Sequence, residues 1–385
     1  MQYRINPKTG AKISALAFGC LRLPKDFEET RRLIHYATRQ GINYFDTAYI
    51  YGNSEAVLGK IFAEDGLRAR VHIATKLPYF MVRKPADFER FFQKQLERLQ
   101  TDYIDYYMIH MLPSLQSWQS LCELGVPDWI QTKKAEGAIR QFGFSFHGPA
   151  AEFRALIDAY DWDFTMIQYN YYDEHFQAGQ QGLHYAAARK IPVMIMEPLR
   201  GGMLVDKLPQ AARDVWANAP GERSIVDWTL RWLFNQPQVF TVLSGMRTID
   251  MVTENAALAA DAAPNRLTNT ELALYDNARN AIRAAIQTPC TACAYCMPCP
   301  VGVDIPACLG FLNDTVLEGK WKTMYWYAST TLGRNASLCI NCKQCEKNCP
   351  QGIPIADMLG RTAKKLEHFP YRLVRAIARK LLRVR

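Results

Sequence analysis

The chain has 385 residues, of which 49% are hydrophobic and 22% charged, a composition typical of a globular protein with room for two domains. No stretch approaches the ~18 uninterrupted apolar residues of a membrane-spanning helix, which excludes an integral membrane protein. The formal net charge is +9, but residues 361–385 carry nine Lys or Arg against one acid, so the rest is nearly neutral. Because no basic stripe with interleaved aromatics runs through that rest, we expect no nucleic-acid binding.

The N-terminus and the cysteines indicate the compartment. The first residues, MQYRINPKTGAKIS, are polar and lack the basic start, apolar run and cleavage site of a secretory signal. We therefore expect a cytoplasmic protein. Nine of the eleven cysteines fall between residues 290 and 349. Such crowding without a secretory signal favours metal or cluster ligation over disulfides.

Short apolar runs rich in β-forming residues alternate with longer helical patterns up to about residue 260. The expected strands span residues 15–19, 42–46, 71–76, 104–110, 139–145, 164–170, 192–198 and 239–245. The helical patterns between them include residues 27–40, 86–99 and 151–160. Eight strand-then-helix units imply parallel pairing, and a closed (β/α)8 TIM barrel accommodates them at roughly 250 residues. An open doubly wound sheet is the alternative. No G-x-G-x-x-G follows an early strand, so the usual dinucleotide fingerprint of such a sheet is missing.

Four polar residues fall at the carboxyl ends of consecutive expected strands. Asp46 ends the second strand, Tyr51 lies in the loop after it, and Lys76 and His110 end the third and fourth. This face is where barrel enzymes keep their catalytic groups. A tyrosine with an ordinary pKa of about 10 donates a proton poorly at neutral pH unless a nearby cation lowers that pKa. Lys76 is the candidate cation, with Asp46 as its ion-pair partner and His110 as a hydrogen-bond donor to a carbonyl oxygen.

After two further helical segments, the composition changes abruptly near residue 286 into QTPCTACAYCMPCPVGVDIP. We therefore expect a barrel in residues 1–285, a small all-α, ferredoxin-like domain in residues 286–360, and a basic amphipathic tail in residues 361–385. Within the small domain, residues 305–314 and 321–331 have helical patterns. This helical spacer resembles the α-helical ferredoxin modules of larger oxidoreductases, which pass electrons onward.

The small domain carries two four-cysteine runs. The first is Cys290-x2-Cys293-x2-Cys296-x2-Cys299-Pro300, and the second is Cys339-x2-Cys342-x2-Cys345-x3-Cys349-Pro350. The second matches the bacterial ferredoxin spacing, and the first is one residue shorter before its last cysteine. In two-cluster ferredoxins the fourth cysteine of each run ligates the other cubane. The spacing therefore predicts two [4Fe-4S] clusters, one held by Cys290, Cys293, Cys296 and Cys349, and the other by Cys339, Cys342, Cys345 and Cys299.

Structural zinc is the alternative for these cysteines. A zinc site needs only four thiolates in two C-x2-C pairs, so eight thiolates in two runs that each end in Cys-Pro fit zinc poorly. The three other cysteines, Cys20, Cys122 and Cys308, are expected in the hydrophobic core.

Seven segments, in order, resemble the aldo-keto reductases: FDTAYIYGNSE, ATK, MIH, GFSFH, MIQYN, MEPLRGG and SGMRTIDMVTEN. The resemblance covers about residues 1–285, and nearly the whole chain is similar to a subgroup with a C-terminal 4Fe-4S dicluster domain. It implies an NAD(P)H-dependent oxidoreductase that reduces a small-molecule carbonyl or oxidises the corresponding alcohol. It also implies a catalytic tetrad of Asp46, Tyr51, Lys76 and His110, with Tyr51 as the general acid.

The same resemblance implies where a nicotinamide nucleotide binds. Ser145, Gln168 and Asn170 would lie near the nicotinamide amide, Pro198, Leu199, Arg200 and Gly201 along the pyrophosphate, and Ser244, Gly245, Met246, Arg247 and Asn255 near the adenosine end. The guanidinium of Arg247 suits a 2′-phosphate and favours NADP over NAD, with an exposed salt bridge as its alternative role. His147 is a candidate substrate contact, with an ordinary loop histidine as the alternative.

The tail from Tyr371 reads YRLVRAIARKLLRVR and places Leu373, Ile377, Leu381 and Val384 on one helical face, with arginines on the others. Such a helix suits the surface of an anionic membrane or an acidic redox partner. Packing against the barrel with a solvated basic face is the alternative.

Three functional readings remain open at this point. The first is an enzyme of the aldo-keto reductase type beside a two-cluster domain. The second is an electron-transfer or redox-sensing protein in which the barrel is a scaffold and the clusters serve a partner. Hydride transfer moves two electrons, each cubane accepts one, and no flavin motif connects them. In the third, the clusters only stabilise the small domain.

Overall fold

The computed structural model describes residues 1–148, 150–290, 296–317, 319–331, 333–349, 351–369, 371 and 373. The chain divides into two compact units, which we call the barrel unit and the helical unit. The barrel unit comprises Met1–Gly201 and Arg223–Thr268, and the helical unit comprises Gly202–Glu222 and Asn269–Arg385. Cys293 and residues 374–385, which include most of the expected basic tail, lie outside the described residues.

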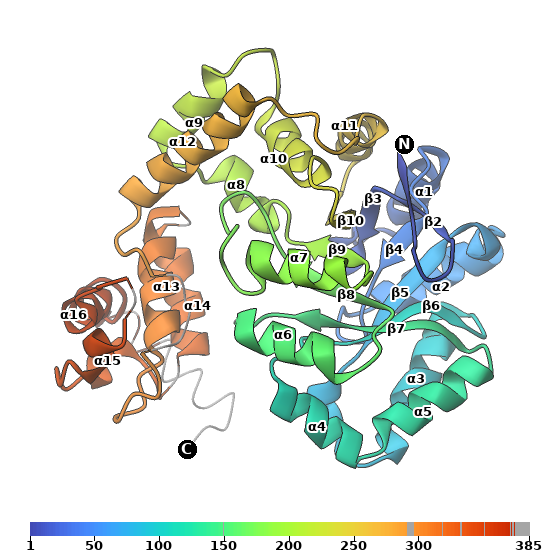
Figure 1. The fold of residues 1–385 in the computed structure, drawn as a ribbon, viewed down its shortest axis with the longest axis horizontal. Coiled ribbons are helices and arrows are strands. Elements are labelled where there is room, and N and C mark those ends of the chain that lie inside the picture. The colour runs from blue at the N-terminus through green and yellow to red at the C-terminus, as the bar shows by residue number, and fades with distance from the viewer. Residues whose placement is uncertain are drawn as a thin grey trace. The chain divides into compact units, whose positions relative to one another are not determined.

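Eight parallel strands close into a barrel in the order β10-β3-β4-β5-β6-β7-β8-β9 (Figure 1). Their bounds are β3 Leu16–Gly19, β4 Tyr44–Asp46, β5 His72–Leu77, β6 Ile104–Ile109, β7 Ile139–Phe146, β8 Phe164–Gln168, β9 Val193–Met196 and β10 Val239–Ser244. Each corresponds to one expected strand, and β10 pairs with β3 to close the ring. The prediction of a TIM barrel is confirmed, and the open sheet is excluded.

Amphipathic helices follow the strands and cover the barrel. Helix α1 shows why they form: the Asp26 side chain accepts a hydrogen bond from Glu29 N at its start, and Leu33, Ile34 and Ala37 are buried along one face. The other helices of this unit are α2 Ser54–Glu64, α3 Ala86–Leu99, α4 Leu115–Glu123, α5 Val126–Ala135, α6 Ala150–Ala159, α7 Gly179–Ala188, α10 Ile225–Phe234 and α11 Ile249–Ala260, and α1 itself is Phe27–Arg39.

A hairpin that the sequence pattern did not predict lies at the amino end of the barrel. Strands β1, Tyr3–Ile5, and β2, Lys12–Ser14, pair antiparallel. Ile13 packs into the barrel interior with Tyr44, Tyr106 and other buried side chains. The interior is therefore a packed core at this end, and chemistry is confined to the carboxyl ends of the strands.

The helical unit contains α8 Met203–Asp206, α9 Gln210–Ala217, α12 Asn269–Ala285, α13 Ile305–Leu317, α14 Lys320–Thr330, α15 Gln344–Lys347 and α16 Ile355–Leu366. The unit differs from the expected domain in that it begins at Asn269 and includes the insertion that carries α9. Helix α12 packs along α9, with the rings of Trp216 and Tyr275 5.2 Å apart. The expected boundary at residue 285 would therefore assign both α9 and α12 to the barrel, whereas the structure groups them with α13, α14 and α16.

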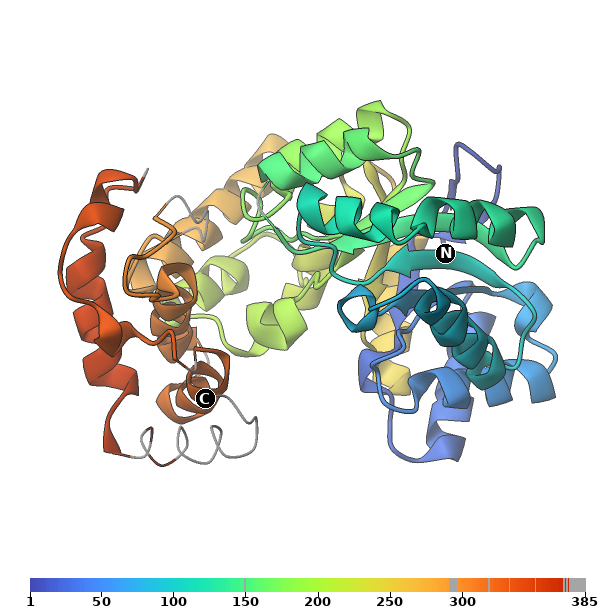
Figure 2. The same cartoon turned by 90° about the horizontal axis from the view of Figure 1, so that it is seen from below.

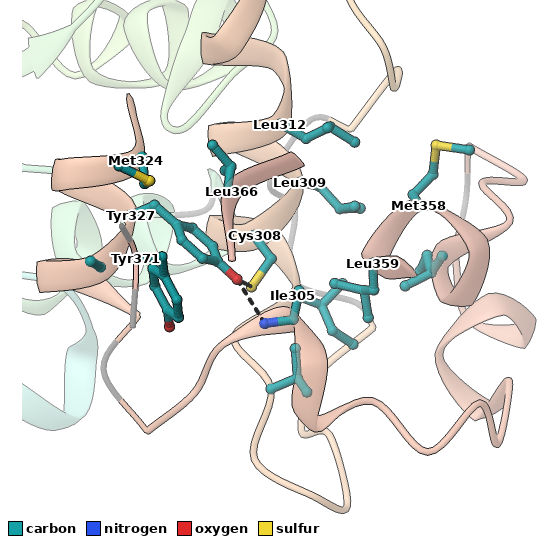
Figure 3. Packing of buried hydrophobic residues seen from close by; sticks show 14 of the residues in the cluster. Ile305, Cys308, Leu309, Leu312, Met324, Tyr327, Met358, Leu359, Leu366 and Tyr371 are labelled. Atoms are coloured by element: carbon teal, nitrogen blue, oxygen red, sulfur yellow. Dashed lines mark hydrogen bonds between the residues drawn. The ribbon is translucent and has the colours of Figure 1, made fainter. Parts of the chain in front are cut away.

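Helices α13, α14 and α16 lie side by side and bury a common core (Figures 1 and 2). Cys308, Leu309 and Leu312 of α13 face Tyr327 of α14 and Leu359 of α16 (Figure 3). The two expected helices of this domain are thus confirmed, and Cys308 is buried as expected.

Two further observations complete the fold. Cys20 is buried, but Cys122 is only half-buried, because it lies near the end of the surface helix α4; the expectation that it belongs to the core is wrong. None of the described helices combines the length and the hydrophobicity needed to cross a bilayer.

Candidate active site and cysteine centre

The four expected catalytic residues lie at the mouth of the barrel. Asp46 is the last residue of β4, Lys76 lies near the end of β5, and His110 follows β6 directly. Lys76 Nζ donates to Asp46 Oδ1 at 2.6 Å and lies 4.9 Å from the centre of the Tyr51 ring. The rings of Tyr51 and His110 are 5.9 Å apart and nearly perpendicular. The structure therefore brings all four side chains together.

The lysine of this group is buried and charged. Lys76 is 1% exposed, and its Nζ also donates to the carbonyl oxygen of Thr47 at 2.6 Å. Burial lowers the pKa of Lys76, but Asp46 and Tyr51 raise it by more, so the pKa lies above its ordinary value. Lys76 thus places a fixed positive charge beside the Tyr51 ring.

Tyr51 and His110 are both held in their neutral forms. Burial raises the pKa of Tyr51, and Lys76 opposes this effect only in part, so the phenol keeps its proton at neutral pH. The expectation that Lys76 brings the Tyr51 pKa below its ordinary value is therefore wrong for the protein alone. Burial, together with Lys76 and His147, lowers the pKa of His110 to about 3. Both rings can consequently donate a hydrogen bond to an oxygen atom.

A buried carboxylate that the sequence reasoning missed braces the loop that carries Tyr51. Glu55 Oε1 accepts from Thr75 Oγ1 at 2.6 Å and from Gln95 Nε2 at 2.8 Å. Its Oε2 accepts from Arg98 Nη1 at 3.0 Å, and Arg98 also donates to the Tyr49 carbonyl. The loop is therefore tied to β5 and α3.

Three buried polar atoms at the mouth have no hydrogen-bond partner within the described part of the chain. They are Asp46 Oδ2, His110 Nδ1 and Gln168 Oε1, and they belong to residues at the carboxyl ends of β4, β6 and β8. Buried polar groups are nearly always paired, so such a group calls for an explanation. A bound ligand at the barrel mouth supplies one.

The residues expected near nicotinamide differ in the hydrogen-bonding groups that remain available to a ligand. Ser145 Oγ accepts from Met111 N at 2.8 Å and keeps its own hydroxyl hydrogen to donate. Gln168 leaves Oε1 without a partner, as described above. Asn170 instead donates to Asp173 and to the Glu197 carbonyl, while its Oδ1 accepts two backbone N–H groups. The hydrogen-bonding capacity of Asn170 is therefore filled within the protein, which argues against the expected contact with nicotinamide.

The segment expected along the pyrophosphate has an unusual backbone. Glu197 and Arg200 have φ values of 56° and 51°, in the left-handed region that non-glycine residues seldom occupy. Such strain is concentrated at functional sites. Pro198 is buried, Leu199 and Arg200 are half-buried, and Gly201 is exposed. This segment follows β9 and therefore lies at the same end of the barrel as the tetrad.

The residues expected at the adenosine end surround the start of α11. Asn255 Nδ2 donates to Ser244 Oγ at 3.0 Å, and both residues are buried. Gly245 and Arg247 are exposed, whereas Met246 is buried with 1% exposure. The side chain of Met246 is therefore a core group, and only its backbone could reach a ligand.

Two further ring side chains lie next to the four residues. His147 Nδ1 lies 3.2 Å from Gln177 Oε1, and His147 is a minor cause of the lowered pKa of His110, after burial and Lys76. Phe80 lies with its ring centre 6.3 Å from that of His110. An aromatic and an imidazole group therefore border the tetrad.

In the helical unit, cysteines of both runs meet around one hollow. A hollow open to solvent is lined by five cysteines, Cys296 and Cys299 of the first run and Cys339, Cys342 and Cys345 of the second. Among the described residues, no three Cys, His, Asp or Glu side chains lie close enough to hold a single metal ion. These thiols are more than the four ligands that one [4Fe-4S] cubane takes.

Cysteines of the other expected cluster also pack on the core of this unit. Cys290, Cys296 and Cys349 are half-buried there, and Cys293 lies outside the described residues. Cys296 and Cys299 of the first run both line the hollow together with cysteines of the second run. The exchange of fourth ligands stays a prediction.

A closed barrel with a buried lysine–aspartate pair, a neutral tyrosine and a neutral histidine at its mouth defines a TIM-barrel oxidoreductase. Residues 15–272 match the aldo/keto reductase family, and the chain belongs to that family. Residues 289–354 match a 4Fe-4S dicluster domain.

Individual relatives and structures resemble the barrel. The chain is 27% identical over 270 residues to the NADH-specific methylglyoxal reductase of Escherichia coli, an alignment that covers 57% of this chain and 79% of that protein. The holo form of aldo-keto reductase AKR11C1 from Bacillus halodurans has a TM-score of 0.61 at 25% identity, covering 72% of this chain and 96% of that one. An aldo/keto reductase from Klebsiella pneumoniae in complex with NADP and acetate has a TM-score of 0.58 at 26% identity, covering 72% and 95%.

Proposed function

We propose that the protein is an NADP(H)-dependent oxidoreductase that reduces the carbonyl group of a small molecule in the barrel, with Tyr51 as the general acid. The observation that carries this proposal is the group formed by Tyr51, Lys76 and His110 at one point of the barrel mouth. Membership of the aldo/keto reductase family supports it.

The residues of this group act on the carbonyl oxygen. His110, neutral because its pKa is about 3, donates a hydrogen bond that orients the oxygen and stabilises the developing negative charge. Tyr51 donates its phenolic proton to that oxygen. Lys76, held by Asp46, stabilises the phenolate that remains. In alcohol oxidation, the same groups would act in reverse.

The nucleotide fits the unpartnered groups at the mouth. A bound nicotinamide supplies the hydride. Gln168 Oε1 and the Ser145 hydroxyl would hold its carboxamide, Pro198, Leu199, Arg200 and Gly201 would lie along the pyrophosphate, and the exposed Arg247 would face the 2′-phosphate. NADP is favoured over NAD on that guanidinium, and the Klebsiella pneumoniae structure contains NADP.

Replacement of Tyr51 by Phe tests this assignment. We expect Tyr51→Phe to lower carbonyl-dependent oxidation of NADPH by about 100-fold or more while the Kd for NADPH stays within about twofold. Tyr36→Phe, on the outer helix α1, is the matched control and should retain both values. Unchanged turnover in Tyr51→Phe, or loss of NADPH binding together with turnover, would contradict the assigned role.

We further infer that the helical unit holds two [4Fe-4S] clusters, with Cys299 and Cys349 exchanged between the two runs. The open hollow and the exposed Cys342 support the proposal that one cluster lies near solvent, which would suit electron exchange with a partner protein. Anaerobic addition of NADPH, followed by electron paramagnetic resonance, tests the alternative of an internal route. Reduced clusters would require that route, whereas clusters that stay oxidised support exchange with a partner.

A further inference from the structure

Asp173 is a buried carboxylate on which three side chains of the barrel mouth converge. Its Oδ2 accepts hydrogen bonds from Gln168 Nε2 at 2.6 Å and from Asn170 Nδ2 at 3.0 Å. Arg200 Nε lies 3.2 Å from the same oxygen. Asp173 is 6% exposed, so these contacts are largely shielded from water.

The local backbone holds this carboxylate in place. Asn170 Oδ1 accepts from the backbone N–H of Tyr172 at 3.1 Å and of Asp173 at 2.9 Å. The turn after β8 is therefore closed by the same asparagine that donates to Asp173. A carboxylate with this support is a fixed acceptor rather than a mobile surface charge.

The contact with Asp173 decides which way the Gln168 amide faces. An ionised carboxylate only accepts hydrogen bonds, so the NH2 group of Gln168 must point at Asp173. Oε1 is then directed away from Asp173, and it is the atom that is buried without a partner in the described chain. A buried acceptor of this kind is costly unless a donor meets it.

We propose that Asp173 is a positioning residue that fixes the Gln168 amide so that Oε1 accepts a hydrogen bond from the carboxamide N–H of nicotinamide. This inference rests on the proposed function, and it adds how the site recognises the carboxamide. Without the carboxylate, the amide of Gln168 is free to rotate and to present its own N–H groups, which would repel the carboxamide N–H.

A nucleotide without that N–H group tests the proposal. The acetyl group of 3-acetylpyridine adenine dinucleotide phosphate replaces the carboxamide and has no N–H to donate, while the rest matches NADP⁺. We expect the wild-type protein to bind NADP⁺ about fivefold more tightly than the analogue. Asp173→Leu, which leaves the NH2 group of Gln168 no acceptor at this position, should bring this ratio close to one. Both nucleotides contain the same pyrophosphate. A change in affinity that acts through Arg200 therefore alters both Kd values by the same factor and leaves their ratio unchanged.

Three further variants control for folding and for coupling. Asp105→Asn changes an equally buried aspartate at the amino end of the barrel, paired with Arg68 and Arg140, and should leave the ratio unchanged. Gln168→Ala should remove the preference while Asp173 keeps its contacts with Asn170 and Arg200. The double variant Gln168→Ala/Asp173→Leu should show no further loss, because both changes remove the same contact.

The outcomes separate this inference from the proposed function. Wild-type protein that binds neither nucleotide contradicts the proposed function and this inference with it. Wild-type protein that binds both equally well overturns the role of Gln168 Oε1 while leaving carbonyl reduction intact. Loss of the preference in Gln168→Ala but not in folded Asp173→Leu overturns the positioning role of Asp173.

Discussion

Lys76 Nζ lies 2.6 Å from Asp46 Oδ1, and both side chains are almost completely shielded from solvent. A buried ion pair adds little stability compared with apolar residues, but removal of one partner leaves an uncompensated charge. The main effect of the pair is therefore to keep a positive charge next to Tyr51, and its contribution to stability is small.

Lys76→Met removes the cation and leaves the aspartate unpaired. We expect turnover to fall by about 100-fold or more, and the free energy of unfolding to fall by roughly 3–5 kcal/mol. The double variant Asp46→Asn/Lys76→Met should recover part of this stability but none of the activity. Urea unfolding and steady-state kinetics measure the two effects, and equal stability of the single and double variants would contradict the account.

His110 makes the stability of the barrel depend on pH. Its pKa in the folded protein is about 3, whereas the unfolded chain takes up the proton near the ordinary value of 6.5. Acidification below pH of about 6.5 therefore favours the unfolded state, by up to ~1.4 kcal/mol per pH unit until the folded-state pKa is reached.

We therefore expect the wild-type protein to lose up to ~2 kcal/mol more than His110→Gln between about pH 7 and about pH 5. Urea unfolding at the two pH values, followed by tryptophan fluorescence, gives this difference. A variant that loses as much stability as the wild type would show that His110 is not held neutral by burial.

The exchange of fourth cysteines predicts which variants share a phenotype. Under anaerobic conditions, Cys299→Ala should lose the same cluster signal as Cys339→Ala, and Cys349→Ala the same signal as Cys290→Ala, in electron paramagnetic resonance of the reduced protein. Cys308→Ala is the control and should keep both clusters, since Cys308 lies in the apolar core 3.8 Å from Tyr327 Oη. If Cys299→Ala instead matches Cys290→Ala, each run holds its own cluster.

Arg247 is expected to select the nucleotide. The side chain is exposed near the start of α11, where it can approach a 2′-phosphate. Arg247→Ala should raise the Kd for NADPH about tenfold and leave the Kd for NADH nearly unchanged. Equal effects on both nucleotides would assign Arg247 to the pyrophosphate or to folding instead.

The barrel was predictable from the sequence because its strands are short, continuous apolar runs separated by helical patterns. All eight strands fall within the expected segments or one residue beyond them. Strands β1 and β2 were not predicted, because three residues each are too few to show the alternation of apolar and polar residues that marks a strand. The grouping of α12 with α9 depends on contacts between segments distant in sequence, which no local pattern reports.

The tetrad was predictable for a similar reason, since a parallel barrel places the carboxyl ends of all its strands on one face. The side chains that support the tetrad could not be predicted in this way. Glu55 acquires its role through partners on β5 and α3, whereas Asp173 and Asn170 depend on the three-dimensional form of the turn after β8. The pKa of Tyr51 also depends on the depth of its burial, which spacing along the chain does not reveal.

Transfer of deuterium from labelled NADPH to a carbonyl substrate tests the central claim most directly. Anaerobically purified protein is incubated with a panel of carbonyl compounds and NADPH that carries deuterium at its hydride position, and the alcohols are analysed by mass spectrometry. We expect at least one alcohol to gain one deuterium with the wild-type protein and none to do so at a comparable rate with Tyr51→Phe. Oxidation of NADPH without deuterated alcohol, or equal labelling by the two proteins, would contradict the account.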